Sequence, residues 1–455
     1  MLSSRWELAG RSLAGGTRAA GTLKATVLLD EARRGAANPW AVAWTPEGHW
    51  LLVTHAGTHE LSIIDARALE EKLAKVPLGA FVTDFGFLDG IRTRVELPGD
   101  GPRALAVSGG QAYVAEFFRD TIAVVDLRSR SVIGEIPLAE HSSAPNLEAL
   151  LNSRERRGVR LSSTAFPPGG PARSGPSGGS NGKRQGLPHS KSWRQVRACR
   201  SRSRQAAVGD CDLVRKGERL FNDATLCHQG WQSCASCHPD GRADGLNWDL
   251  LNDGIGNPKN TRSLLLAAET PPEMSLGVRP TFDGAVRAGL RHVLYTEPRP
   301  ETVKAIEAYL RSLKPVPSPY LAGAGGSPHF FRGSGRRSGG KRRRTDPGDG
   351  KLSEAARRGR RIFGLAGCAD CHTPPLFTDR RPHDVGTRRS FDKPNDLFYT
   401  PTLIECWRTA PYLHDGSAVT VRGVLTRNNP HDAHGRTSHL SEEELDNLVE
   451  YVLSL

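Results

Sequence analysis

The chain changes its pattern of apolar and polar positions along its length. In residues 39–137, short runs of Val, Ile and Tyr alternate with small or polar residues, which is typical of half-buried β-strands. Residues 212–321 and 352–455 contain segments whose apolar positions recur at i, i+3, i+4 and i+7, which indicates amphipathic helices. The pattern therefore predicts an all-β region followed by two mostly helical regions.

The β-region contains an internal repeat. The segment PWAVAWTPEGHWLLVTHAGTHELSIIDARA aligns with GPRALAVSGGQAYVAEFFRDTIAVVDLRS, and each reads as strand, turn, strand, polar turn and a third strand. The repeat resembles a YVTN-type β-propeller blade. A blade takes about 40–45 residues and a ring needs at least about four blades, so residues 25–140 supply only a partial propeller. Either another chain supplies the missing blades or they were lost, and a small antiparallel sheet packed on the next domain is the alternative.

Four segments of the later regions predict helices in two matching pairs. RKGERLFNDA and ARRGRRIFGLAG each carry a Gly followed by a large aromatic residue, Phe221 or Phe363. PETVKAIEAYLRSL and SEEELDNLVEYVLSL are both amphipathic. Ser441 and Glu444 form a capping box at the start of the last helix, and Pro315 follows the earlier one as a stop signal.

Composition excludes several classes of protein. Residues 141–211 and 322–351 are rich in Gly, Ser, Pro and Arg and poor in large apolar residues, so we expect disordered linkers there. The densest basic runs fall in these segments, so the net charge of +13 reads as solvated charge, and no nucleic-acid partner is expected. Residues 1–24 read as a tail that lacks the apolar core of a secretory signal. No apolar run is long enough for a transmembrane segment.

Four of the eight cysteines form the pattern Cys-x-x-Cys-His twice, as Cys234, Cys237 and His238 and again as Cys368, Cys371 and His372. Two thiols on one helical turn can form thioethers with the two vinyl groups of a porphyrin, and the next imidazole then ligates the iron. A zinc site would need both halves close in the fold, and a dithiol redox pair gives no reason for the histidine. The motifs predict two covalently attached c-type haems, with both histidines as iron ligands.

Met and His are the usual sixth ligands of c-type haem iron. The chain has two methionines, and one of them is its first residue. The other, Met274, lies in the Pro-rich loop TPPEMSLGVR, so we expect it to be the sixth ligand of the first haem iron. A methionine that only fills a gap in the packing is the alternative. No Met follows the second motif. Among His414, His431, His434 and His439, the first candidate is His434, and an open, reactive iron is the alternative.

Residues 212–455 resemble the bacterial diheme cytochrome c peroxidase family, in a branch fused to YVTN-type propellers. The stretches that carry the resemblance are FNDATLCHQGWQSCASCHPDGRADGLNWDLLNDGIGNPKNTRSLLLAAETPPEMSLGVR and TPTLIECWRTAPYLHDGS. The resemblance implies haem binding, electron transfer from a redox protein or small donor, and reduction of a small oxidant such as hydrogen peroxide. The attachment of c-type haem implies a periplasmic or other extracytoplasmic location. The family's axial Met, expected near Asn428, is absent.

Other functions stay open at this point. A haem with both axial positions filled cannot bind a substrate, so a non-catalytic electron carrier or redox sensor is the alternative to an enzyme. A third interpretation is a defective, truncated product, because the propeller is incomplete and no secretory signal is visible. A peroxidase would also need a group that moves protons near the open iron, and the sequence does not choose among the candidates Glu405, Arg408, His414 and Asp415.

Two further features have weaker signals. The loop DGRADGLNWDLLNDGIGNPKN is rich in Asp, Asn and Gly, which suits either calcium bound through oxygen atoms or turn chemistry. Cys227 and Cys406 lie outside the haem motifs, and a disulfide between them would link the two haem domains in an oxidising compartment.

Together these patterns predict a multidomain chain in which mostly α, tandem cytochrome c domains follow a partial all-β, propeller-like region. The expected boundaries are a tail at 1–24, the β-region at 25–140, a linker at 141–211, the first cytochrome c domain at 212–321, a basic linker at 322–351 and the second cytochrome c domain at 352–455.

Overall fold

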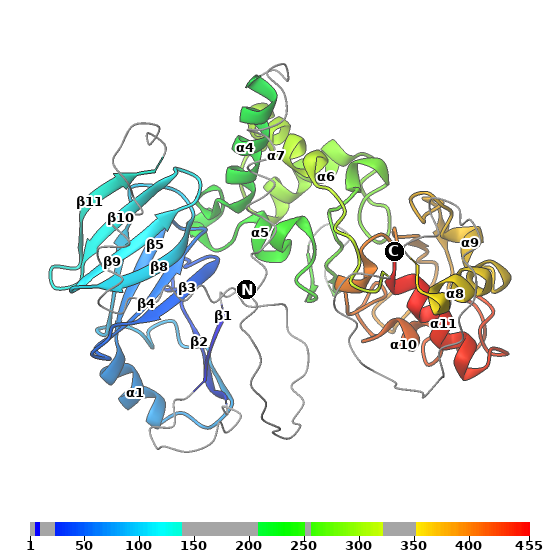
Figure 1. Cartoon of the computed structure of the whole chain (residues 1–455), viewed down its shortest axis with the longest axis horizontal. Coiled ribbons are helices and arrows are strands. Elements are labelled where there is room, and N and C mark those ends of the chain that lie inside the picture. Colours follow the sequence, from blue (N-terminus) through cyan, green and yellow to red (C-terminus); the bar gives the residue numbers. More distant parts are fainter. Residues whose placement is uncertain (1–4, 10–22, 139–207, 251–255, 322–351) are drawn as a thin grey trace, which may run out of the picture. The chain divides into compact units, whose positions relative to one another are not determined.

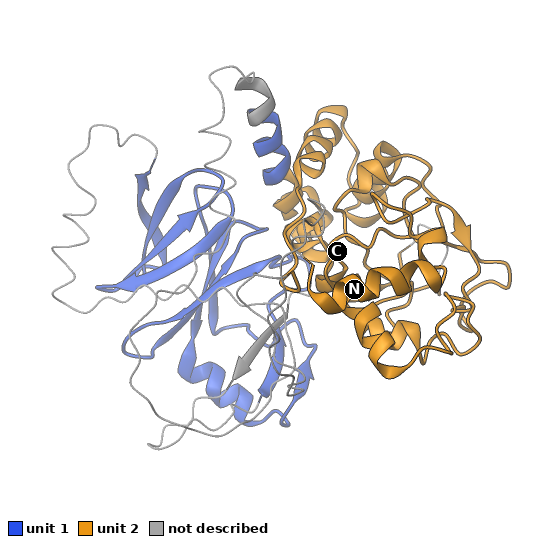
Figure 2. Ribbon diagram, turned by 45° about the vertical axis from the view of Figure 1, so that its right-hand side comes forward, with its two compact units in different colours: residues 1, 3–219 blue, residues 2, 220–455 orange. Residues whose placement is uncertain are grey.

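The computed structural model of the chain describes residues 5–9, 23–138, 208–250, 256–321 and 352–455. The chain divides into two compact units, residues 3–219 and 220–455 (Figure 2). The linker predicted at 322–351, and the one predicted at 141–211 up to residue 207, lie outside the described residues.

The described part of the first unit contains three sheets, and strands form in the region of alternating pattern as predicted (Figure 1). One is three-stranded, with the order β1 (Arg5–Ala9), β2 (Leu23–Leu28) and β6 (Ala80–Val82). The next is four-stranded and antiparallel, formed by β3 (Pro39–Trp44), β4 (Trp50–His55), β5 (Glu60–Asp65) and β7 (Arg92–Glu96). The last is an antiparallel meander of β8 (Pro102–Ser108), β9 (Gln111–Glu116), β10 (Thr121–Asp126) and β11 (Ser131–Pro137).

The repeat thus forms two four-stranded antiparallel sheets, and their assignment as propeller blades stays a prediction. The segment predicted to be a tail is not wholly one, because β1 pairs antiparallel with β2, with Arg5 opposite Leu28. Sequence pattern could not show this pairing, since the partner strand lies beyond an intervening segment and register is set by the packed faces.

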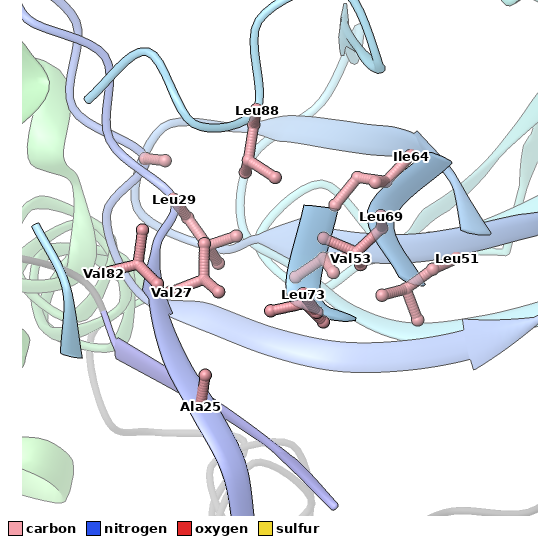
Figure 3. Close-up of a cluster of buried hydrophobic side chains, with 11 residues drawn as sticks. Ala25, Val27, Leu29, Leu51, Val53, Ile64, Leu69, Leu73, Val82 and Leu88 are labelled. Atoms are coloured by element: carbon pink, nitrogen blue, oxygen red, sulfur yellow. The ribbon is translucent and has the colours of Figure 1, made fainter. Parts of the chain in front are cut away.

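The sheet of β3, β4, β5 and β7 is buried on both faces. Leu51 and Val53 of β4 point into one cluster, together with Leu69 and Leu73 of helix α1 (Ala66–Ala74) (Figure 3). Leu52, between them in the sequence, points to the opposite face and into a cluster shared with the β8–β11 meander. Successive strand residues face opposite sides, so this sheet reads as continuous apolar runs instead of strict alternation.

A buried histidine stabilises the end of β4. His55 Nδ1 donates to the carbonyl of Ala36 at 3.1 Å, and Nε2 lies 2.8 Å from Ser62 Oγ. Burial, and then the charges of Arg94 and Arg92, lower the pKa of His55 to about 3. The imidazole is therefore neutral in the folded protein at pH 7.

The second unit contains two sets of helices. The first set is α4 (Val208–Asn222), which begins in the first unit, α5 (Cys234–Cys237), α6 (Phe282–Ala288) and α7 (Pro300–Ser312). The second is α8 (Glu354–Leu365), α9 (Cys368–Cys371), α10 (Val421–Leu425) and α11 (Glu442–Leu453). Two short hairpins complete it: β12 (Asn247–Trp248) with β13 (Lys259–Asn260), and β14 (Pro382–His383) with β15 (Phe398–Tyr399). We call residues 220–321 its N-terminal half and 352–455 its C-terminal half.

The four predicted helices are confirmed as α4, α7, α8 and α11. The capping box is formed as expected, with Ser441 N donating to Glu444 Oε2 at 2.9 Å. Helices α8 and α11 pack side by side (Figure 1). Gly359 permits their close approach, since a Cβ there would lie 1.8 Å from the carbonyl oxygen of Asn447.

The two halves repeat each other in detail. Phe221 packs on Tyr309, and Phe363 packs on Tyr451, each with ring centroids 5.3 Å apart. The loops before α6 and α10 also match. Residues with positive φ recur at equivalent positions, as in the pairs Leu266 with Glu405 and Met274 with Leu413. The second unit is therefore an internal duplication of one helical fold.

We predict that acid destabilises the first unit through His55. The free histidine of an unfolded chain binds a proton below its ordinary pKa of 6.5, whereas the folded chain binds one only near pH 3. The neutral ring therefore makes its full contribution to the free energy of unfolding above pH 6.5, and this contribution is lost as the pH falls toward 3. Between pH 7 and pH 5, we expect the free energy of unfolding to fall by about 2 kcal/mol. Hydrogen exchange of peptides from β4 and β5 in the full chain measures this loss.

The variant His55→Gln should flatten that dependence, because glutamine does not titrate. His49→Gln, at an exposed position, is the matched control and should keep the wild-type dependence. An unchanged slope in His55→Gln would contradict the assignment.

Candidate haem-binding sites

Each Cys-x-x-Cys-His motif forms one helical turn followed by its histidine. Helix α5 carries Cys234 and Cys237, and α9 carries Cys368 and Cys371. In both motifs the histidine backbone N–H donates to the carbonyl of the first cysteine at 2.9 Å. The two turns therefore present the same arrangement of two thiols and one imidazole.

The cysteines of the motifs are free and hold their protons. Burial raises the pKa of the Cys234 thiol to about 12 and that of Cys368 to about 11. Reactive and metal-binding cysteines instead have a lowered pKa, because the thiolate is the active form. This environment is unlike that of a zinc ligand or a redox dithiol, and it fits thiols that receive an apolar group.

Both histidines make a hydrogen bond from Nδ1 to a backbone carbonyl, which favours the tautomer that ligates a metal through Nε2. His238 Nδ1 donates to the carbonyl of Arg242 at 3.0 Å, and His372 Nδ1 donates to the carbonyl of Phe377 at 3.1 Å. Burial lowers the pKa of both imidazoles, so both are neutral. A neutral ring whose second nitrogen donates to a carbonyl is the usual state of a ligating histidine.

The ring of His434 lies near that of His372. Their ring centroids lie 6.3 Å apart, with the ring planes at 32°. With imidazole–metal bonds of about 2.0–2.1 Å, the length known for zinc, two rings on opposite sides of one metal have centroids about 6.2 Å apart. Burial, and then the charge of His372, lower the pKa of His434 to about 4, so it too is neutral.

The loop that carries His434 is fixed by a residue that the sequence did not single out. Asn429 is buried, and its Oδ1 accepts the N–H of His434 at 2.8 Å. Its Nδ2 donates to the carbonyl of Gly435 and to Thr437 Oγ1. A Cβ on Gly435 would lie 3.5 Å from Cys368 Sγ, so this loop runs close to the second motif.

The other histidine candidates lie elsewhere. His414 Nε2 pairs with Asp392 Oδ2 at 2.8 Å, and its ring stacks on Phe398 with centroids 3.8 Å apart. His431 and His439 are exposed. Of the four candidates, the structure brings His434 to His372.

The described contacts of Met274 involve its main chain, so they leave the predicted role of its side chain untested. The hydrogen bonds described for it are made by its carbonyl oxygen, which accepts from Arg262 Nη1 at 2.7 Å. Its counterpart in the C-terminal half is Leu413, whereas His434 comes from a later loop. Met274 as a sixth ligand stays a prediction.

The two equivalent loops differ in charge. The N-terminal half places Arg262, Glu273 and Arg279 where the C-terminal half has Pro401, Tyr412 and Ala418. Burial raises the pKa of Glu273 to about 7, and the charge of Arg262 opposes that shift. Charged groups are therefore buried beside one motif and replaced by apolar or aromatic groups beside the other.

A buried ion pair joins the halves. Arg242 Nη2 lies 2.9 Å from Glu405 Oε1, and the two side chains are 7% and 1% exposed. Arg242 Nε also donates to Glu405 Oε2 at 3.0 Å. Glu405 was a candidate for proton transfer, but its oxygens are engaged in this pair, which supports a structural role.

Two equivalent backbone hydrogen bonds connect the halves, and each half donates one of them. Asn260 N donates to the carbonyl of His414 at 2.7 Å, and Tyr399 N donates to the carbonyl of Ser275 at 2.9 Å. The donors end the equivalent hairpins, and the acceptors lie in the equivalent loops. The halves are thus interlocked by the same contact made twice, as expected of a pseudo-twofold arrangement.

The weaker expectations have mixed outcomes. Asp244 and Asp249 accept hydrogen bonds from backbone N–H groups of their own loop, as turn chemistry requires, and calcium there stays a prediction. The disulfide expected between Cys227 and Cys406 is wrong, because both thiols are free and buried. The Sγ of Cys406 donates to the carbonyl of Val452 instead.

The duplicated helical unit with two Cys-x-x-Cys-His turns defines a dihaem-type c cytochrome architecture. No family model matches the chain. Over 299 residues it is 32% identical to hydrazine synthase subunit gamma of Kuenenia stuttgartiensis, which covers 54% of this chain and 78% of that protein. It is 28% identical to the methylamine utilization protein MauG of Methylorubrum extorquens, over 47% of this chain and 67% of that protein.

A more distant relative is the cytochrome-c peroxidase IdrP2 of Denitromonas iodatirespirans, at 22% identity over 49% of this chain and 74% of that protein. The chain belongs to the family of diheme peroxidase-like proteins that includes hydrazine synthase subunit gamma. The resemblance seen in the sequence is confirmed at this level, and the fusion to a propeller is not part of what these relatives establish. Within the described residues, no helix is both long enough and apolar enough to span a membrane.

We predict that Gly277→Ala weakens the interlock of the halves. Gly277 has φ +65°, and a Cβ there would lie 2.2 Å from the ring of Tyr399. The ring must move, which we expect to cost about 1–3 kcal/mol of unfolding free energy. Gly289→Ala is the control, since its Cβ would meet nothing within 4 Å and its φ is negative. Thermal or denaturant unfolding of the two variants measures the difference, and equal stabilities would argue against the close contact.

Proposed function

We propose that the chain binds two haems covalently and transfers electrons between them. Cys234 and Cys237 would hold the first porphyrin, and Cys368 and Cys371 the second. The observation that carries the proposal is the repeated turn in which two protonated thiols precede a neutral, carbonyl-bonded histidine. Relatives described as MauG and cytochrome-c peroxidase support it.

At the second haem, His372 and His434 would occupy the two axial positions. The 6.3 Å between their ring centroids and the neutral state of both rings support this assignment. An iron with both axial positions filled does not bind a substrate and changes its coordination little between oxidation states, which suits electron transfer. Asn429 and the carbonyl of Phe377 would orient the two rings.

The first haem, held by His238, is then the site for a small oxidant. Buried charges lie beside this motif and are replaced by apolar groups beside the other, which supports a reactive role here. The proposed reaction is peroxide reduction, in which the O–O bond breaks and two protons and two electrons convert hydrogen peroxide into two waters. The electrons would come from a donor protein or small molecule by way of the second haem.

A non-catalytic electron carrier is the second candidate. It is favoured if Met274 completes the first iron, because no position is then open for peroxide. A relative named as a subunit of hydrazine synthase also favours a role as an electron-transfer subunit within a larger assembly. Both candidates require the same covalent haems, for which an extracytoplasmic location is expected. The spin state of the first haem separates them, and Met274→Leu reports on this residue: an axial Met predicts a low-spin iron that becomes high-spin in the variant.

We predict two haems per chain when the protein is made in a host that attaches c-type haem. Intact mass should show the chain plus two porphyrins. Replacing Cys234 and Cys237 with alanine should leave one haem, and replacing Cys368 and Cys371 should leave the other. A chain that carries no haem in this host would refute the proposal and favour a defective product.

We predict that His434→Ala converts the second haem from low spin to high spin. Removing the imidazole that faces His372 opens one axial position of that iron. Visible and electron paramagnetic resonance spectra of the oxidised protein measure the change, and exogenous imidazole should restore the low-spin signal. His439→Ala, at an exposed position, is the control. A low-spin second haem in His434→Ala would show that another residue is the ligand.

A further inference from the structure

Arg242 connects the N-terminal haem site to the C-terminal half. Arg242 lies four residues after His238, and its main-chain carbonyl accepts the Nδ1–H of that imidazole at 3.0 Å. The side chain of the same arginine makes two parallel hydrogen bonds to the carboxylate of Glu405, at 2.9 and 3.0 Å. The backbone of Arg242 thus holds the imidazole while its side chain is held by the other half.

Further contacts fix this pair. Arg242 also donates to the carbonyls of Asp240 and Lys314, at 2.9 and 3.1 Å. Glu405 accepts the backbone N–H of Val316. A buried ion pair persists only where its geometry is good and its remaining donors and acceptors are satisfied. The carbonyl that faces His238 therefore has little freedom to move.

The C-terminal half holds its histidine in a different way. The carbonyl that accepts from His372 belongs to Phe377, whose ring packs edge-on against Phe363 with centroids 6.3 Å apart. Both aromatic residues lie in that same half. The position equivalent to Glu405 in the N-terminal half is occupied by Leu266, so the ion pair has no counterpart across the pseudo-twofold arrangement.

We propose that Glu405, acting through Arg242, is a positioning residue for His238 and makes the reduction potential of the first haem depend on the C-terminal half. This inference rests on the proposed function, in which His238 ligates that haem. A firm hydrogen bond from Nδ1 makes an imidazole a stronger ligand and favours the oxidised iron. Releasing the Arg242 carbonyl should therefore raise the potential of the first haem and change the orientation of its imidazole.

Two variants of the two-haem protein separate positioning from simple charge. Glu405→Gln keeps the shape of the side chain and removes its negative charge. The double variant Arg242→Gln with Glu405→Gln removes one charge of each sign. If charge alone acts, the single variant raises the potential of the first haem and the double variant leaves it near the wild-type value. If positioning acts, both variants raise it, and the double variant by at least as much.

Electron paramagnetic resonance of the oxidised first haem gives the second readout, because its signal reports the orientation of the axial imidazole. Positioning predicts an altered signal in both variants and an unchanged second haem. The matched control, Phe377→Leu, should alter the second haem alone. Measuring Glu405→Gln by itself keeps the test decisive if the double variant does not fold.

Three outcomes would overturn the inference. A wild-type potential and spectrum in the double variant, or a shifted potential with an unchanged spectrum in Glu405→Gln, would leave charge as the whole effect. The third is a wild-type protein that lacks a haem at Cys234 and Cys237. That result refutes the proposed function itself, and it is distinguishable because the haem content is measured before any variant is compared.

Discussion

The hydrogen bond from a histidine Nδ1 to a backbone carbonyl is the constraint on which both candidate sites depend. It fixes the tautomer, keeps Nε2 unprotonated and sets the direction in which the imidazole can bind a metal. His238 and His372 make this bond at 3.0 and 3.1 Å. The helical turns α5 and α9 place each histidine directly after its second cysteine, within reach of its carbonyl partner.

Duplication gives the second unit two similar sites, and divergence gives them different properties. The Phe–Tyr pairs, the helical turns and the reciprocal backbone bonds are common to both halves. Among the side chains that differ, His434 lies near one motif, and buried arginines and a glutamate lie beside the other. Under the proposed function, such a division would let one iron pass electrons while the other meets the oxidant, without a change in the underlying fold.

The sequence predicts the features that depend on neighbouring residues. Strand alternation, the helices, the capping box at Ser441 and both Cys-x-x-Cys-His turns are local patterns, and the structure contains them. It also ranks His434 first among four histidines, but it does not find Asn429, which holds that loop. The ion pair of Arg242 with Glu405 and the pairing of β1 join segments far apart in the chain, so only the folded packing defines them. The expected disulfide fails for the same reason, since cysteine spacing does not encode proximity.

The narrow space between His372 and His434 has a consequence for the order of assembly. The ring centroids are 6.3 Å apart, and Asn429 holds the backbone of the loop that carries His434. The segment around Gly435 also passes close to Cys368, since a Cβ on that glycine would lie 3.5 Å from Cys368 Sγ. If a haem is attached at Cys368 and Cys371 as proposed, the loop of His434 and Gly435 would have to settle against the porphyrin after the thioether bonds form.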